Sequence, residues 1–356
     1  MNYDEVDDWS GQLWYEDVTG VAVDTHDRVY LLQRGPVAVT VLDRDGAVVG
    51  RWRNEWFSDR PHLISIGRDD LVRIADDGGH RVFTFDLDGR LLGSIGDGAP
   101  SRTGFDQSTH PRLEDALSHM GGGLPFNRPT KLVSSPSGDL YVSDGYRNCR
   151  VHRFTADGQL LTSWGGPGPE PGHFVIPHSL TVDNDGRILV CDRENDRIQV
   201  FTGNGELLDV WDNVQRPTDV AVDRRGFLYV TELPRGPLDL ASWRLGRADA
   251  TRPGRVSVWS PQGTLVGRIE PPECEFSAPH AIAVDSSGAF YVAEVPESFA
   301  TSTGRAQRTH RCLRKFQPRH TPSQQTSPSP TNPTGADVRP YGFLPHAVGA
   351  QPRREI

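Results

Sequence analysis

Histidine and threonine alternate at one recurring position, the second residue of six short segments that each precede an apolar run. In chain order these segments are Val18-Thr19, Pro61-His62, Pro129-Thr130, Pro177-His178, Pro217-Thr218 and Pro279-His280. Three neutral imidazoles brought together suit zinc or another divalent transition metal and leave a fourth position for water or substrate. A lone histidine in such a turn would be interpreted as structural, but three at equivalent positions are poorly explained by coincidence. We therefore predict a metal site made by His62, His178 and His280.

An internal repeat must bring these histidines together. Each segment opens a unit with an apolar strand, a polar turn and a second strand that ends in an acidic residue, as in Leu180–Asp183 followed by Ile188–Asp192. A third strand and a fourth follow, often separated by Asp-Gly or Asn-Gly, which is a hairpin signal. Four short strands in about 40–45 residues are typical of a propeller blade, and helix signals are nearly absent.

Six such units predict an all-β protein, a six-bladed β-propeller over residues 18–317. The first strand of each blade lines the central channel of a propeller, so alternate histidines should converge around its axis. Residues 1–17 form an N-terminal segment that could close the ring. Residues 318–356 are rich in Pro, Ser and Thr, so we expect a disordered tail. Insertions near 98–127, 233–254 and 296–310 should cover one face and shape a pocket.

A second set of equivalent positions follows the second strand of each unit. It contains Tyr146 in the third unit and places Arg34 of the first unit in register with Arg193 of the fourth. Two arginines at one end of the channel could bind a substrate carboxylate; the alternative is that they tie neighbouring blades together through Asp or Glu. For Tyr146 the alternative is an aromatic plug under a loop. The acidic residues that end the second strands are expected to be structural acceptors: Asp76, Asp144, Asp192, Glu232 and Glu294.

Composition and charge exclude several classes of protein. The 356 residues carry a formal net charge of −9, which argues against nucleic acid and anionic membranes as partners. No apolar run approaches the 18 or so residues of a membrane span. The acidic N-terminus has neither part of a secretory signal, and the four cysteines form no Cys-x-x-Cys pair. We expect a cytoplasmic protein with a small-molecule substrate; the sequence identifies no protein partner.

The central stretches resemble peptidyl-α-hydroxyglycine α-amidating lyase, a six-bladed propeller of the NHL-repeat type. The resemblance covers about residues 18–316 and is most specific in Tyr141–Arg150, Pro177–Leu180 and Cys191–Phe201. It implies a zinc-dependent carbon–nitrogen lyase that cleaves an N-acyl-α-hydroxyglycine into an amide and glyoxylate. It also implies zinc on the three histidines, a catalytic role for Tyr146, and substrate carboxylate binding by Arg34 and Arg193.

Two departures from the family matter. The family has an aspartate directly after the third histidine, which serves a structural calcium, whereas Ala281 stands here and argues against that ion. The family's disulfide cysteine beside the tyrosine is Arg147 here, which fits an intracellular setting. Hormone maturation is therefore not the expected role.

Two alternatives remain open at this point. The same metal site could serve a hydrolase acting on a lactone or ester, although three histidines favour zinc over calcium. The chain could also be a binding propeller without catalysis, as many NHL-repeat proteins are. A substrate panel separates the first alternative from the lyase, and metal content tests the second.

Overall fold

Each of the six repeats forms one antiparallel sheet of four strands in the computed structural model, which describes residues 3–11, 17–101, 125–270, 275–303 and 312–319. The first three sheets follow the chain in order, each from its inner to its outer strand. Blade 1 contains β2 (Val18–Val23), β3 (Val29–Gln33), β4 (Val37–Leu42) and β5 (Val48–Arg53). Blade 2 contains β6 (Pro61–Ile66), β7 (Val72–Asp76), β8 (Arg81–Phe85) and β9 (Leu91–Ile95). Blade 3 contains β10 (Lys131–Ser134), β11 (Leu140–Asp144), β12 (Arg150–Phe154) and β13 (Leu160–Gly165).

The remaining sheets continue the same pattern up to the last one. Blade 4 contains β14 (Pro177–Val182), β15 (Ile188–Asp192), β16 (Arg197–Phe201) and β17 (Leu207–Trp211), with the 3₁₀ turn η1 (Arg193–Asn195) after β15. Blade 5 contains β18 (Pro217–Val222), β19 (Leu228–Glu232), β20 (Arg255–Trp259) and β21 (Leu265–Ile269). Blade 6 contains β22 (Pro279–Val284), β23 (Phe290–Glu294), β24 (Leu313–Pro318) and, as its outer strand, β1 (Tyr3–Glu5).

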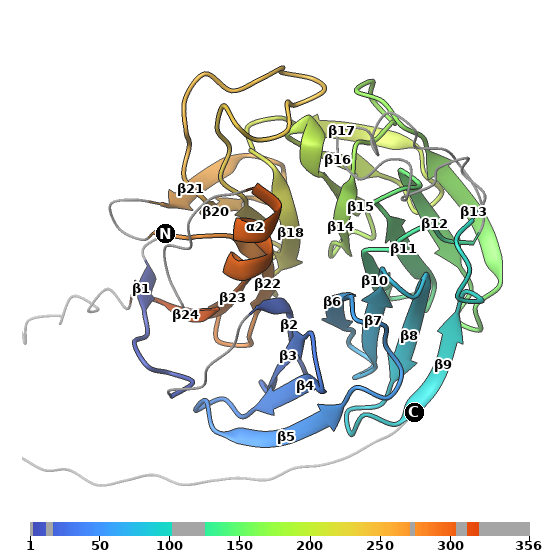
Figure 1. Ribbon diagram of the computed structural model, residues 1–356, viewed down its shortest axis with the longest axis vertical. Coiled ribbons are helices and arrows are strands. Elements are labelled where there is room, and N and C mark those ends of the chain that lie inside the picture. The colour runs from blue at the N-terminus through green and yellow to red at the C-terminus, as the bar shows by residue number, and fades with distance from the viewer. Residues whose placement is uncertain (1–2, 12–16, 102–124, 271–274, 304–311, 320–356) are drawn as a thin grey trace, which may run out of the picture. The chain divides into compact units, whose positions relative to one another are not determined.

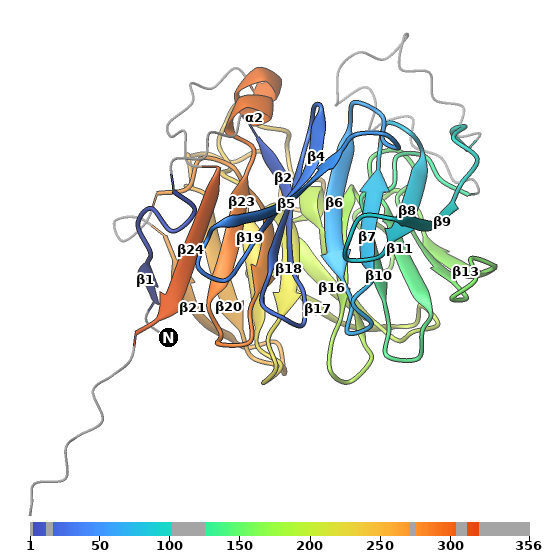
Figure 2. The same cartoon turned by 90° about the horizontal axis from the view of Figure 1, so that it is seen from below.

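The six sheets stand around a central axis, which confirms the predicted six-bladed β-propeller (Figure 1). Consecutive inner strands are neighbours, and β2 lies beside both β6 and β22, so the ring is closed. Closure is completed by pairing between the two ends of the described chain, since Tyr3 lies opposite Pro318 in β24. Figure 2 shows the inner strands running side by side across the thickness of the ring.

Apolar side chains from neighbouring blades form the core. One cluster joins Tyr30 and Leu32 of blade 1 to Ile74 and Phe85 of blade 2, all of them buried. Burial of each large apolar side chain stabilises the fold by about 1.5–3 kcal/mol. Because this packing runs between blades and not toward the axis, it leaves the channel lined by the inner strands alone.

Buried carboxylates at the ends of the second strands tie each blade to the loop before its inner strand. Asp144 accepts from the Asn127 backbone N–H at 2.8 Å, and Glu294 accepts from the backbone N–H of Ser277 at 2.7 Å. Asp76, Asp192 and Glu232 make equivalent bonds. The structural role predicted for these acids is confirmed.

One helix, α2 (Pro296–Thr303), was not expected from the sequence. It follows β23 and begins beside the start of β22, on the face where the inner strands have their amino ends (Figure 2). Its segment is short and rich in Ser and Thr, and the carboxylate that caps it is Asp17, which accepts from the backbone N–H groups of Glu297 and Ser298, each at 3.0 Å. A cap supplied from so far along the chain gives no local sequence signal.

Parts of three predictions lie outside the described residues. These are the centre of the 98–127 insertion, the end of the 296–310 insertion, and the tail from residue 320 onward. Within the part of the chain that is described, no helix has both the length and the apolar character needed to cross a membrane.

Candidate metal centre

A β-bulge places the recurring histidines on the channel axis. In β6 the register with β7 shifts between Pro61 and Leu63, and the residue left out of the ladder is His62. The same shift leaves out His178 in blade 4 and His280 in blade 6. A bulge turns one side chain out of the regular alternation, and proline tolerates the first position of a strand. The same shift leaves out Thr19 and Thr218 in blades 1 and 5, so the bulge belongs to the repeat, and the sequence decides which side chain it turns inward.

The three imidazoles converge. One nitrogen from each of His62, His178 and His280 lies within 4.8 Å of the others, and the ring centroids are 4.7 to 5.0 Å apart. All three residues are buried, with at most 6% of their surface exposed. The prediction that alternate blades bring these three residues together is thus confirmed.

Threonine carbonyls of the intervening blades orient the rings. The Nδ1–H of His62 donates to the Thr130 carbonyl at 2.9 Å, and His178 donates in the same way to Thr218 at 2.7 Å. His280 completes the cycle by donating to Thr19 at 2.7 Å. Because Nδ1 carries the proton in each ring, Nε2 has a free lone pair for a ligand, an arrangement typical of metal-binding histidines.

The electrostatic environment keeps the histidines neutral. Burial holds the pKa of each imidazole well below its ordinary value of 6.5. The positive charge of Arg193 lowers the pKa of all three further, and Arg34 acts in the same direction on His62 and His280. Metal binding needs unprotonated nitrogen, so these residues fit a divalent transition metal such as zinc.

Tyr146 lies against the histidine cluster. Its hydroxyl is 3.0 Å from Nε2 of His62 and 3.3 Å from Nε2 of His178. The ring is half-buried and lies edge-on to both imidazoles. A hydroxyl in this position can donate a proton toward the cluster or accept one from a molecule bound beside it.

Both predicted arginines reach the same place from opposite blades. The Arg193 guanidinium carbon is 5.7 Å from the centroid of the Tyr146 ring, and its Nε donates to Glu194 at 2.8 Å. Glu194 is fully buried and is shared with Arg216 at 3.0 Å and Arg235 at 3.3 Å. Although burial alone would raise the pKa of Glu194, the three guanidiniums hold it at about 2.

Arg34 is positioned by the unexpected helix. Its Nη1 donates to the Ser298 hydroxyl at 2.9 Å, and that hydroxyl donates to Asp17 at 2.5 Å. Among the residues that the structure describes, no carboxylate lies within salt-bridge distance of Arg34, and its buried Nε has no partner. The guanidinium therefore keeps donors available for a ligand.

Sequence reasoning missed two further cations near the tyrosine. Arg60 makes a bidentate pair with the buried Asp77 at 2.8 and 3.2 Å, and Arg60 and Arg128 both interact electrostatically with Tyr146. A signal was present in the sequence, because an arginine directly precedes the proline of Pro61-His62, Pro129-Thr130 and Pro217-Thr218.

Ala281 follows the third histidine and has no side-chain ligand atom. The equivalent position in blade 5 is Asp219, which pairs with the ammonium of the buried Lys131. Asp219 also accepts from Ser179 Oγ at 2.5 Å and from the Ile282 N–H at 3.1 Å. The Asp219 carboxylate is therefore neutralised by a cation of the chain itself.

Comparison with known proteins places the chain in a family. A model of the NHL repeat matches residues 126–154 and 174–201, which belong to blades 3 and 4. Human NHL repeat-containing protein 3 is 31% identical over 293 residues, covering 77% of this chain and 76% of the human protein. The chain belongs to this family of NHL-repeat proteins.

Lyases are also among the relatives of this NHL-repeat protein. Peptidyl-α-hydroxyglycine α-amidating lyase 1 of Drosophila melanogaster is 29% identical over 284 residues, covering 74% of this chain and 48% of that protein. Peptidyl-glycine α-amidating monooxygenase B of Xenopus laevis is 25% identical over 349 residues, covering 88% of this chain. The chain spans only 37% of the length of the Xenopus protein. The predicted relationship to the amidating lyases is thus confirmed at the level of distant homology.

Solved structures agree on the architecture. A streptogramin B lyase structure superimposes with a TM-score of 0.54 at 14% identity, covering 88% of this chain and 97% of that one. Virginiamycin B lyase from Staphylococcus aureus gives a TM-score of 0.51 over 82% of both chains. At this level of identity the likeness shows the propeller fold alone.

Proposed function

We propose that this NHL-repeat protein is a zinc-dependent lyase that cleaves the carbon–nitrogen bond of an N-acyl-α-hydroxyglycine-like substrate. The observation that carries the proposal is the Tyr146 hydroxyl, which lies within 3.3 Å of two of three neutral, converging histidines. Its support from known proteins is the similarity to the amidating lyase of Drosophila melanogaster.

The reaction needs no co-reactant. The α-hydroxyl loses its proton, a carbonyl forms at that carbon, the C–N bond breaks, and the departing amide nitrogen gains a proton. The products are a primary amide and glyoxylate. A zinc ion held by His62, His178 and His280 would supply Lewis-acid stabilisation of the negative charge that develops on oxygen.

Tyr146 carries the proton in this scheme. Its oxygen, which lies 3.0 and 3.3 Å from Nε2 of His62 and His178, accepts the proton of the substrate hydroxyl as its own hydroxyl proton passes to the departing amide nitrogen. One group can do both because the two sites on the substrate are separated by a single carbon atom.

Arg34 and Arg193 bind the substrate carboxylate. Arg34 is fixed through Nη1 by Ser298, and Arg193 is fixed through Nε by Glu194, so each retains other N–H groups for the ligand. Guanidinium donors match a carboxylate in geometry as well as charge. Binding the carboxylate from two blades holds the adjacent C–N bond in one orientation against Tyr146.

The first experiment measures metal content by elemental mass spectrometry and turnover of N-benzoyl-α-hydroxyglycine by release of benzamide and glyoxylate. We expect about one zinc per chain, and Tyr146→Phe should lower kcat/KM by at least about 100-fold while the zinc is retained. Tyr141→Phe is the matched control, because its hydroxyl contacts only the Gly203 carbonyl at 3.3 Å, outside the site.

Three outcomes would overturn the proposal. Intact turnover in Tyr146→Phe would remove the tyrosine from the mechanism. Hydrolysis of a lactone or ester panel without release of glyoxylate would favour the hydrolase. A protein that takes up no transition metal when zinc is supplied would favour a binding propeller.

A further inference from the structure

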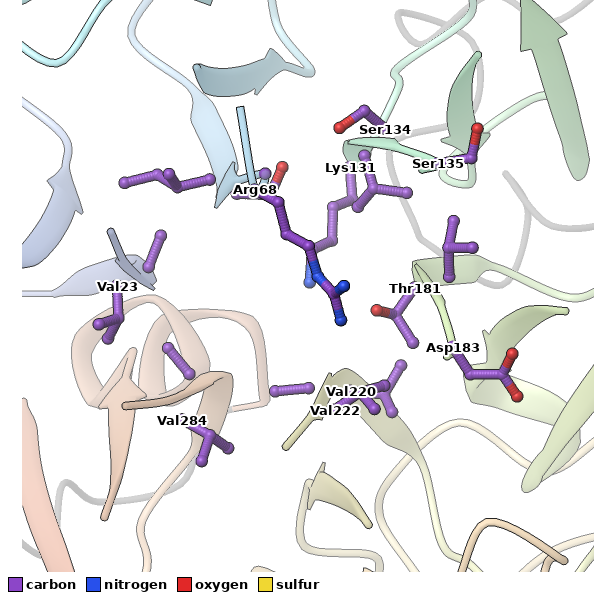
Figure 3. Close-up of a pocket in the computed structure, with 18 of the residues that line it drawn as sticks. Val23, Arg68, Lys131, Ser134, Ser135, Thr181, Asp183, Val220, Val222 and Val284 are labelled. Atoms are coloured by element: carbon purple, nitrogen blue, oxygen red, sulfur yellow. The ribbon is translucent and has the colours of Figure 1, made fainter. Parts of the chain in front are cut away.

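The end of the channel opposite the histidines contains a cavity of about 530 Å³ (Figure 3). It is bounded by the carboxyl ends of all six inner strands, each of which contributes apolar side chains. One from each blade in turn is Val23, Ile66, Val133, Val182, Val222 and Val284. Small-molecule sites typically have 300–1,000 Å³, so the size is that of a ligand site, and the lining combines these apolar side chains with polar ones such as Ser134 and Thr181.

A polar layer separates this cavity from the metal centre. The cavity lining begins at Ile64 and Ile282, each two residues or about 7 Å of strand beyond a histidine, and extends to the strand ends at residues such as Ile66. Between the two ends, the buried ion pair of Lys131 and Asp219 crosses the axis, and Lys131 forms part of the cavity wall. A molecule bound among the strand ends, beside Ile66, therefore lies about 13 Å of strand from His62.

One guanidinium enters the cavity. Figure 3 shows the Arg68 side chain extended from the end of β6 into the open space. It donates a hydrogen bond of 3.2 Å to Asn184 Oδ1, and no carboxylate of the described residues lies within salt-bridge distance of it.

The other charged groups of the lining are neutralised by partners of their own. Asp69 pairs with Arg73 at 2.5 Å, and Asp183 pairs with the guanidinium of Arg187 at 2.7 Å. Lys131 is paired with Asp219. The described lining therefore carries one positive charge, on the exposed Arg68, that no carboxylate of the described residues neutralises.

We propose that this cavity is a second ligand site, which binds a small amphipathic monoanion with a carboxylate on a short apolar chain. The carboxylate pairs with Arg68, and the chain lies against the valine and isoleucine walls. Burial of an apolar chain is favourable in proportion to the area removed from water, and a charge-assisted bond to guanidinium adds orientation. A dianion would leave one negative charge without a partner in this lining, and a cation would be repelled by Arg68.

Isothermal titration calorimetry of the full chain with octanoate, and with octanamide as its neutral analogue, tests the proposal. We expect saturable binding of octanoate, and Arg68→Gln should weaken it by about tenfold or more while octanamide binding is unchanged. Arg225→Gln is the matched control, since it removes the same charge from an exposed arginine that does not line the cavity. Thr181→Phe, which fills part of the cavity, should weaken both ligands.

Several results would overturn the second site. These are no saturable heat with octanoate, equal octanoate affinity in Arg68→Gln and Arg225→Gln, or full affinity in a Thr181→Phe protein that melts like the wild type. Zinc content measured in parallel should be the same in all four proteins, because none of the changes touches the histidine cluster. Failure of the lyase proposal would leave these outcomes unaffected.

Discussion

Blades 2, 4 and 6 have histidine where blades 1, 3 and 5 have threonine, and this difference separates the candidate metal ligands from the residues that orient them. The even blades present His62, His178 and His280 at the start of their inner strands. The odd blades present threonine at the same position: Thr19, Thr130 and Thr218. Each histidine donates to the backbone carbonyl of the threonine in the next blade. One backbone repeat thus supplies both the donors and the groups that orient them.

The threonine side chains extend this support unequally. Thr130 Oγ1 donates to the Pro177 carbonyl at 3.0 Å, and Thr218 Oγ1 donates to the Pro279 carbonyl at 2.9 Å. These carbonyls directly precede His178 and His280. The hydroxyl of Thr19 bonds to Leu32 in its own blade at 3.3 Å. Two of the three threonines therefore also anchor the strand that carries the next histidine.

The largest effect is expected when one of the three histidines is removed. His178→Ala should lose bound zinc and turnover together, because two imidazoles leave the site one protein ligand short. Elemental mass spectrometry and the glyoxylate assay measure both. His173→Ala, at an exposed residue outside the cluster, should behave as wild type. Full zinc in His178→Ala would show that the cluster is not the binding site.

The two predicted arginines also differ in what holds them. Arg193, in blade 4, is held by the buried carboxylate of Glu194. The pKa of Glu194 is about 2 in the folded chain and about 4.3 when unfolded, so the native state binds fewer protons between these values. The stability that this carboxylate provides is therefore fully present above about pH 4.5 and is lost as the pH falls toward 2.

Glu194→Gln should accordingly lower the free energy of unfolding of the metal-free protein at pH 7 by about 2–4 kcal/mol. The difference from wild type should shrink when urea unfolding is repeated near pH 3.5. Glu206→Gln, at an exposed carboxylate, should change stability by less than about 0.5 kcal/mol. A Glu194→Gln difference that stays constant with pH would contradict the ion-pair explanation.

An intermediate effect on zinc affinity is expected when a threonine hydroxyl is removed. Thr218→Val removes the hydrogen bond to Pro279 and should weaken zinc binding by about tenfold, the lower end of what is usual for groups that orient metal ligands. Thr19→Val makes the same change where no bond reaches a histidine-bearing strand, and its affinity should stay near wild type. Competition with a chelator measures both. Equal affinities would remove the distinction between the threonines.

The smallest effect is expected at Arg34, which belongs to blade 1 and is positioned by the neutral hydroxyl of Ser298. Ser298→Ala should raise KM by roughly three- to tenfold with kcat unchanged, because the guanidinium loses one hydrogen bond of positioning. Ser298→Thr keeps the hydroxyl and should restore KM. A fall in kcat without a change in KM would assign the helix a different role.

Much of the site was predictable because its signals are local or periodic. The alternation of His62, His178 and His280 with threonine is visible in the sequence, and a propeller of six repeats must bring alternate positions together around its axis. Arg34 and Arg193 were found in the same way, as equivalent positions of the repeat. Each of these predictions needs only the repeat length and the direction of the inner strands.

The remaining features depend on pairs of residues that no repeat relates. Lys131 meets Asp219 across the channel, and Asp17 caps a helix that begins at Pro296. The Arg68 cavity exists because six strand ends leave space that their own side chains do not fill.

By itself, the sequence determined the number of blades, the residue that each blade presents at the axis, and the family. The tertiary structure decided which charges neutralise one another, which helix holds Arg34, and where the channel stays open. The physical reason is one of range. Strand alternation and turn chemistry act within a few residues, whereas ion pairing, capping across the chain and cavity shape arise only once the ring has closed.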